Sequence, residues 1–192
     1  NDKRGIRLKN TYFTGYFPLI AIIMFSLSFS IYTVGKIMEF LGEIGLYAGL
    51  LEFFSPAEIK LMLLFLLFLL FFMVFAALKL LSDTFLDISL LFFSDDREGS
   101  VHKWARFGSV IYFIGGGISL LCAMSFALIS LVFFVTTMFA FMYFLYKASP
   151  YFTSAGLVGF VFFHVLLWGC ILTAVGYAVI KLYNSLLASL PV

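Results

Sequence analysis

The imidazole of His164 is the only ionisable side chain deep inside an apolar stretch of this sequence. Such a group at membrane depth is a functional candidate, because hydrocarbon solvates it poorly unless it binds a ligand or moves a proton. A neutral imidazole can equally donate to a backbone carbonyl or to a hydroxyl on a neighbouring helix, and Trp168, one turn later, could stack on it. Structural packing and a proton or ligand role therefore both stay open.

Three consecutive glycines interrupt a second apolar stretch. Glycine lowers helix stability by about 1 kcal/mol relative to alanine and lets a neighbouring backbone approach closely. One interpretation is helix packing, within or between subunits, by Gly108, Gly116, Gly169 and Gly176. The alternative is a broken helix that lines a substrate or ion site. That intramembrane polar site would comprise Gly115, Gly116, Gly117, His164 and Thr173, with further hydroxyls from Ser119, Thr136 and Thr137.

Motifs of known enzyme classes are absent from the sequence. The acidic pairs Glu39/Glu43 and Asp83/Asp87 have the i, i+4 spacing of one helix face, which suits a solvated surface better than a cation site. Both cysteines lie in apolar runs, where cysteine is ordinarily a small packing residue. We therefore expect no catalytic residue, no cofactor-binding residue and no metal site, and the chain is predicted not to be an enzyme.

The elements that must position these residues are membrane helices. Residues 61–78 read LMLLFLLFLLFFMVFAAL, an apolar run that as a helix covers about 27 Å, close to the hydrocarbon thickness of a bilayer. Of the 192 residues, 64% are hydrophobic and 11% are charged, whereas a soluble domain has about a quarter charged. The net charge of +2 is too small to indicate nucleic acid, so the lipid bilayer is the expected partner.

The predicted fold is all-α: a polytopic integral membrane helical bundle, a single transmembrane domain over residues 1–192, with amphipathic interfacial helices. Ser55, Pro56 and Glu58 form a capping-box pattern at the start of one span. Ser149 and Pro150 precede the last span. Five spans are preferred, over residues 17–34, 56–78, 107–126, 129–146 and 155–180.

Residues 107–146 leave the span count open because they contain no charged residue. As one helix this segment would be about 60 Å long, twice the hydrocarbon thickness. Two spans joined by a tight hairpin near residues 125–130 match the length better, although that turn lacks Pro, Asn, Asp and Gly. A single long helix, shielded by a partner subunit and giving four spans in all, is the alternative.

The distribution of Lys and Arg indicates the orientation. Residues 1–9 carry four of them and residues 79–106 carry four more, whereas residues 35–60 carry two against four Glu. By the positive-inside rule the N-terminus and residues 79–106 are cytoplasmic. Residues 37–54 are predicted to lie in the outer interface as an amphipathic segment. Residues 80–93 are predicted to continue the second span as a helix that leaves the membrane.

Two segments, KNTYFTGYFPLIAIIMFSLSFSIYTVG at residues 9–35 and AEIKLMLLFLLFLLFFMVFAALKL at residues 57–80, resemble the YufK-like family of small bacterial integral membrane proteins. The resemblance covers most of the chain and is strongest in its first half. It implies a multi-pass protein of the bacterial plasma membrane. The family is uncharacterised and has no defined site motif, so the resemblance transfers no functional residue.

Two classes of function follow from the sequence. The first is a non-catalytic membrane subunit, scaffold or regulator that forms a homo-oligomer or packs against another membrane protein. The second is a small transporter or channel with a site near Gly115, Gly116, Gly117 and His164. A polar cavity at membrane depth would favour the second class, and tight dry packing of these residues would favour the first.

Overall fold

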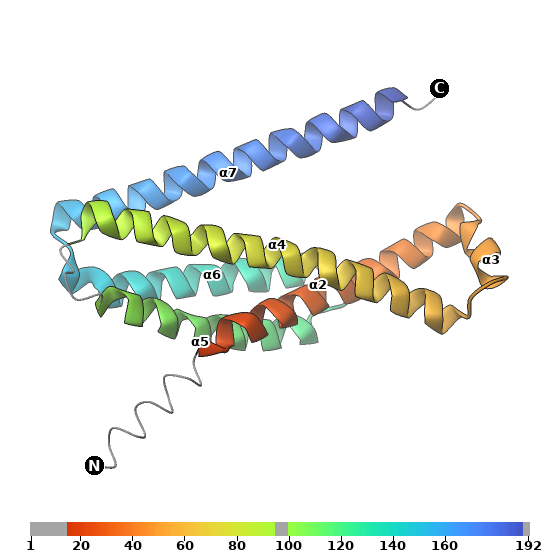
Figure 1. Cartoon of the computed structure of the whole chain (residues 1–192), viewed down its shortest axis with the longest axis horizontal. Helices are drawn as coiled ribbons and strands as arrows, with labels where there is room; N and C mark the ends of the chain where they lie inside the picture. Colours follow the sequence, from red (N-terminus) through yellow and green to blue (C-terminus); the bar gives the residue numbers. More distant parts are fainter. Residues whose placement is uncertain (1–14, 95–99, 190–192) are drawn as a thin grey trace, which may run out of the picture. The chain divides into compact units, whose positions relative to one another are not determined.

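The chain is an all-α helical membrane bundle, described here from a computed structural model of residues 15–94 and 100–189 (Figure 1). The charged residues 1–9 used for the orientation lie outside the described residues. The helices in chain order are α2 (Phe17–Glu43), α3 (Leu46–Leu51), α4 (Pro56–Phe93), α5 (Ser100–Leu121), α6 (Phe126–Ala148), the 3₁₀ helix η1 (Ser149–Tyr151) and α7 (Ser154–Ser189).

The helices belong to two compact units. Of the described residues, the first unit comprises 15–80 and 100–148, and the second comprises 81–94 and 149–189. Helix α4 contributes its first part to the first unit and its last turns to the second.

Four of the described helices are long and apolar enough to cross a membrane: Phe17–Glu43, Pro56–Phe93, Phe126–Tyr151 and Ser154–Ser185. The apolar part of α5, Phe107–Leu121, is shorter. The five-span arrangement therefore stays a prediction.

The charge-free segment 107–146 is divided between two helices. Helix α5 ends at Leu121 and α6 begins at Phe126, so the break comes slightly before the predicted residues 125–130. The Cys122 N–H donates to the carbonyls of Ile118 and Ser119, which tightens the last turn, and the Ser125 N–H then donates to Cys122 O. Backbone hydrogen bonds thus make this turn without Gly or Pro.

Helix α2 ends at a glycine in the left-handed conformation. Gly45 has φ 75°, which a residue with a Cβ adopts only with strain, and its N–H donates to Gly42 O at 3.1 Å. Because α2 continues to Glu43, residues 37–43 of the predicted interfacial segment 37–54 are a direct extension of the first span. Its location in the outer interface stays a prediction.

Helix α4 begins with the predicted capping box. The Ser55 N–H donates to Glu58 Oε2 at 2.8 Å, and the Glu58 N–H donates to Ser55 Oγ at 3.3 Å. The helix then runs unbroken to Phe93. This confirms that residues 80–93 continue the helix of the second predicted span.

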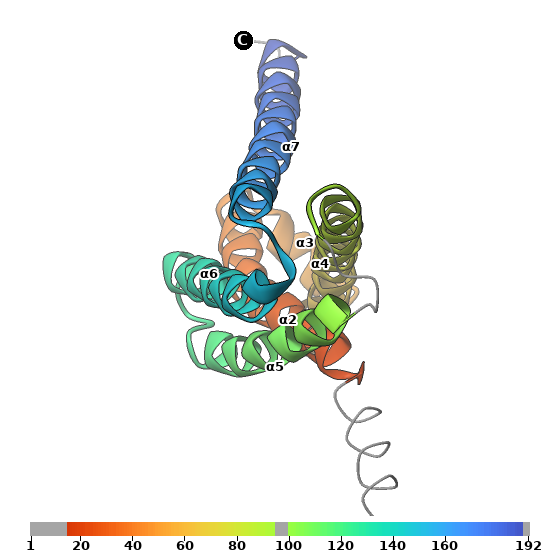
Figure 2. The ribbon, with the colours of Figure 1, turned by 90° about the vertical axis from the view of Figure 1, so that its left-hand side faces the viewer.

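Three helices form the centre of the first unit: α5 packs along α2 and along α6 (Figures 1 and 2). Aromatic rings fill the core between them and α4. Phe25 contacts the rings of Phe75 and Phe133 at centroid distances of 6.0 and 5.3 Å, and Phe29 contacts Phe75 at 5.5 Å. Phenylalanine is abundant in this chain partly because it builds this interior.

The second unit pairs the last turns of α4 with the first half of α7. The Phe85 ring meets Trp168 edge-on at 5.6 Å, and the Phe93 ring meets Phe163 at 5.9 Å. Helix α7 starts after η1, and the Gly156 N–H donates to Thr153 Oγ1 at 3.0 Å, which caps the helix.

Candidate functional site

Gly115, Gly116 and Gly117 lie inside α5, which continues through them without a break. A methyl group on Gly115 would lie 2.6 Å from Thr136 Cγ2 of α6. One on Gly116 would lie 3.1 Å from Met24 Cβ of α2. Successive residues of a helix point about 100° apart, so adjacent glycines admit different neighbours. The glycine run therefore lets α5 fit closely against α2 and α6 at the same level.

Two buried hydroxyls join α2 to α5 beside the glycines. Ser28 Oγ and Ser119 Oγ lie 2.8 Å apart, and both side chains are fully buried. Ser28 Oγ also lies 2.9 Å from Met24 O, and Ser119 Oγ lies 2.7 Å from Gly116 O. One serine therefore donates to the carbonyl of its own helix while the other donates across the interface. The Ser119 hydroxyl thus lies against the carbonyl oxygen of Gly116. A transport site at the glycine run would need that oxygen free to coordinate an ion.

Three buried serines of α2 were not among the predicted site residues: Ser26, Ser28 and Ser30 are all fully buried. The hydroxyls of Ser26 and Ser30 donate to the carbonyls of Ile22 and Ser26, four residues earlier. The signal was present: three serines at alternate positions within an otherwise apolar span. The remaining predicted hydroxyls of this unit are those of Thr136 and Thr137 in helix α6. Thr136 is buried against Gly115, and Thr137 Oγ1 donates to Phe133 O.

His164 belongs to the second unit and is 7% exposed. Its Nδ1 lies 3.2 Å from Ser89 Oγ of α4, and its ring stacks on Phe160 at a centroid distance of 4.4 Å. The predicted hydroxyl partner on a neighbouring helix is thus Ser89. The ring found stacked on the imidazole is Phe160, whereas Trp168 contacts Phe85.

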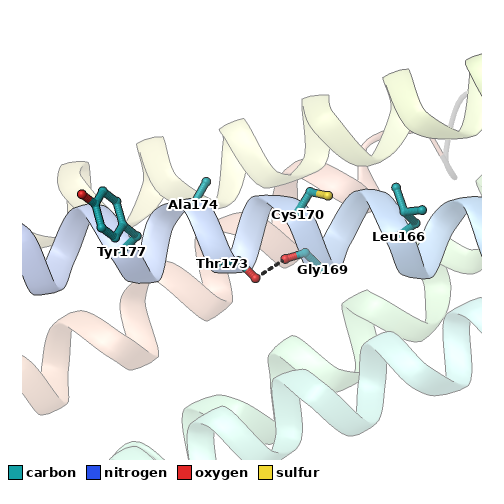
Figure 3. Close-up of a pocket in the computed structure, with 6 residues that line it drawn as sticks. All are labelled: Leu166, Gly169, Cys170, Thr173, Ala174 and Tyr177. Carbon is teal, nitrogen blue, oxygen red and sulfur yellow. Dashed lines mark hydrogen bonds between the residues drawn. The ribbon is translucent and has the colours of Figure 1, made fainter.

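Thr173 and the surrounding face of α7 form an open, apolar groove (Figure 3). The Thr173 hydroxyl donates to Gly169 O at 2.8 Å, within its own helix. His164 and Thr173 are nine residues apart, which is about 14 Å along the helix axis. All the residues that line this groove belong to α7, so it is a shallow, open feature of one helix face: Leu166, Gly169, Cys170, Thr173, Ala174 and Tyr177.

The four glycines proposed for helix packing have different surroundings. Gly116 lies against Met24 and the carbonyl of Ala21 on α2, inside the first unit. A methyl group on Gly169 or Gly176 would meet no described atom within 4 Å. The same holds for Gly108.

The residues of the predicted polar site are divided between the two units. Gly115, Gly116 and Gly117 belong to the first unit, whereas His164 and Thr173 belong to the second.

Among the described residues, no group of three or more His, Cys, Asp or Glu is arranged to hold a metal ion. Cys122 and Cys170 are free thiols. The buried polar side chains of the described part, chiefly serines, are hydrogen-bonded. The arrangement offers close packing and internally satisfied hydroxyls rather than a recognisable constellation of acid, base and nucleophile.

Residues 34–191 match the model of a protein family described as "Family of unknown function (DUF5366)". The chain is 43% identical over 185 residues to "Uncharacterized membrane protein YufK" of Bacillus subtilis (strain 168), an alignment that covers 96% of this chain and 100% of that protein. No solved structure matches the chain. The resemblance to YufK-like proteins is thus confirmed, and neither description assigns a catalytic activity.

Proposed function

The chain belongs to the DUF5366 family, and we propose that it is a non-catalytic component of the bacterial plasma membrane. In this proposal it acts as a subunit, scaffold or regulator by packing its helices against a second copy or another membrane protein. Its 43% sequence identity to a membrane protein of Bacillus subtilis and its long apolar helices support a location in a membrane.

The filling of the glycine run carries this proposal. Gly115 lies against Thr136, and Gly116 lies against Met24, so neighbouring helices occupy the space that a bound substrate would need. The Ser119 hydroxyl lies against the carbonyl of Gly116. A transport site with free carbonyls would require these contacts to open. Close helix packing is the use that the present arrangement supports.

Helix α7 supplies the surface on which association is best tested. The groove around Thr173 consists of small and apolar residues, and its threonine hydroxyl donates within its own helix. Small residues allow two membrane helices to approach closely, and association in lipid depends on such packing because hydrophobic burial gives little driving force there.

The proposed orientation places the N-terminus in the cytoplasm. The clusters of Lys and Arg at residues 1–9 and 79–106 support it through the positive-inside rule. Residues 35–60, with four Glu against two Lys, would then lie outside.

Photo-crosslinking in native membranes tests the association. A photoreactive phenylalanine replaces Leu166, which lines the α7 groove, and in a matched variant it replaces Leu66, an exposed residue of α4. The proposal predicts a discrete protein adduct from position 166 and none from position 66. Masses of the protein in nanodiscs distinguish a second copy from a different partner. A single-copy mass together with no protein adduct from either position would contradict the proposed function.

A further inference from the structure

Helices α2 and α4 extend farther than α5 and α6 at one end of the first unit (Figure 1). The rings of Phe71 in α4 and Phe126 in α6 both contact Phe29 of α2, at centroid distances of 5.5 and 5.6 Å, so the three helices share a level there. Because α6 begins at Phe126, the α5–α6 turn lies only about 5 Å beyond that level. The apolar run of α4 continues from Phe71 back to Leu61, about 15 Å farther. The turn therefore stops roughly 10 Å short of the end of that run.

Charged residues mark the level at which this end of the first unit leaves the hydrocarbon. Lys60 directly precedes the apolar run of α4. Along α2, Glu39 is about 15 Å from Phe29, and along α4, Lys60 is about 16 Å from Phe71, so the two charges lie at about the same level. The apolar run of α4 covers about 27 Å, so a bilayer matched to it ends at these charges. The α5–α6 turn then lies on the hydrocarbon side of them.

The α5–α6 turn has the character of a segment in contact with lipid. Leu121 is 86% exposed and Met124 is 96% exposed. The N–H groups of Cys122, Ala123 and Ser125 all donate to carbonyls of the last turn of α5 or of the turn itself. Hydrocarbon offers no hydrogen-bond partner, so such internal bonds are what a turn at this depth needs.

The opposite end of α6 has a different composition. Tyr143, Tyr146 and Lys147 lie there, and Lys147 Nζ is 5.3 Å from the centroid of the Tyr146 ring. Tyrosine and lysine are typical of the membrane interface, and the α5–α6 turn contains neither. The apolar part of α5, Phe107–Leu121, covers only about 22 Å as a helix, which is less than the hydrocarbon thickness. The two helices thus have an anchor at one interface, and α5 is too short to reach the other.

We propose that α5 and α6 form a re-entrant hairpin whose turn lies in the hydrocarbon of the outer leaflet, covered by the acyl chains of outer-leaflet phospholipids. Acyl chains fit this surface because Leu121 and Met124 offer apolar contact area without charge. Beyond the level of the turn, α4 likewise exposes apolar side chains, among them Phe65 and Leu66. If the turn instead lay at the outer interface, this part of α4 would stand in water, against the hydrophobic effect.

The re-entrant hairpin keeps the orientation that the positive-inside rule indicates. A hairpin returns to the side from which it enters, so residues 79–106 and Lys147 stay on the cytoplasmic side. The helices α2 and α4 then cross the membrane, whereas α5 and α6 do not. This inference does not depend on the proposed scaffold function, because it concerns the depth of a turn and the lipid around it.

Tryptophan fluorescence of the protein in nanodiscs tests the depth and the cover of the turn. In a chain whose Trp104 and Trp168 are replaced by phenylalanine, Met124→Trp reports on the α5–α6 turn. Two matched variants report on exposed positions of known character: Leu66→Trp in the apolar run of α4 and Phe53→Trp in the turn before α4. The quenchers are phosphatidylglycerol brominated midway along its acyl chains and aqueous iodide.

The proposal predicts that the tryptophan at position 124 behaves like the one at position 66. Brominated lipid should remove most of its fluorescence and iodide little, whereas the tryptophan at position 53 should respond mainly to iodide. Quenching by iodide at position 124 as strong as at position 53 would place the turn at the surface and overturn the proposal. Weak quenching by both agents would show that protein covers the turn, which also overturns it.

A second set of labels keeps the proposal testable if the variant without native tryptophan fails to fold. Spin labels are attached at the same three positions after Cys122 and Cys170 are replaced by alanine. Oxygen is enriched in hydrocarbon, and a water-soluble nickel complex is excluded from it. Frequent collisions with oxygen and rare collisions with nickel at position 124 support the proposal, and the reverse pattern, or few collisions with either, overturns it.

Discussion

Alanine substitutions along the glycine run of α5 should have three different effects, although the residues are adjacent. A methyl group at position 117 would lie 3.5 Å from Met24 Cε, an ordinary van der Waals distance. At position 116 the nearest atom is Met24 Cβ at 3.1 Å. At position 115 the methyl group would lie 2.6 Å from Thr136 Cγ2 and 2.9 Å from Thr136 Cβ, and Thr136 is buried.

The magnitudes follow from two opposing terms. Replacing glycine by alanine inside a helix stabilises it by about 1 kcal/mol, and overpacking a tight interior costs about 1–3 kcal/mol. Gly117→Ala has the first term alone and should stabilise the protein by about 1 kcal/mol. Gly116→Ala needs a shift of a few tenths of an ångström by a neighbour and should be nearly neutral. Gly115→Ala collides with the base of a buried side chain and should destabilise by about 1–2 kcal/mol.

The assay is reversible unfolding in bicelles, with Gly35→Ala, whose methyl group meets no described atom within 4 Å, as the control for helix propensity. A double-mutant cycle adds Thr136→Ala, which removes Oγ1 and Cγ2 of Thr136, leaves only its Cβ near the added methyl group, and should recover part of the loss at position 115. Equal stabilities of the Gly115 and Gly117 variants, or additive effects of Gly115→Ala and Thr136→Ala, would refute the inferred packing of α5 against α6.

Three further experiments test other parts of the structure. In a double-mutant cycle of Ser28→Ala and Ser119→Ala, the coupling free energy of unfolding should be about 0.6 kcal/mol, the average for hydrogen bonds between membrane helices, and additivity would contradict the hydroxyl pair. Gly156→Ala places a methyl group 2.7 Å from the carbonyl oxygen of Phe93, so spin labels on α4 and α7 should show a displaced α7 start, and an unchanged distance would contradict this contact. Gly45→Ala forces alanine to φ 75° and should lower the free energy of unfolding by about 1–2 kcal/mol, whereas an unchanged value would show that the turn relaxes.

Features that depend on neighbouring residues in the sequence were predicted well. The capping box of Ser55 and Glu58, the continuation of α4 to Phe93 and the division of residues 107–146 into two helices all appear in the structure. Each rests on a local rule: an orphan donor needs an acceptor, and an unbroken apolar helix should not greatly exceed the bilayer thickness. Such rules need no knowledge of which helices meet.

Pairings between helices could not be predicted in the same way. In a soluble helix the apolar stripe identifies the buried face, but in lipid both the buried and the lipid-facing positions are apolar. Nothing in the sequence alone says that His164 meets Ser89 or that Ser28 meets Ser119, although both pairs are buried and close. In such a sequence only small and hydroxyl-bearing residues indicate a helix–helix interface, and they do not indicate which helix packs against it.

The glycine run illustrates how one sequence feature can favour two incompatible interpretations. Three glycines lower the stability of α5 by about 3 kcal/mol relative to alanines, which made a broken helix a reasonable alternative. The helix nevertheless continues, and the reason is geometric: Gly115 admits Thr136 from α6 while Gly116 admits Met24 from α2. A single small residue would admit one neighbour, whereas a helix packed closely against two others at one level needs small residues in two directions. The loss in helix propensity is then offset by packing contacts on both sides of α5. Side chains of the neighbouring helices fill the space beside the glycines, so no gap remains there.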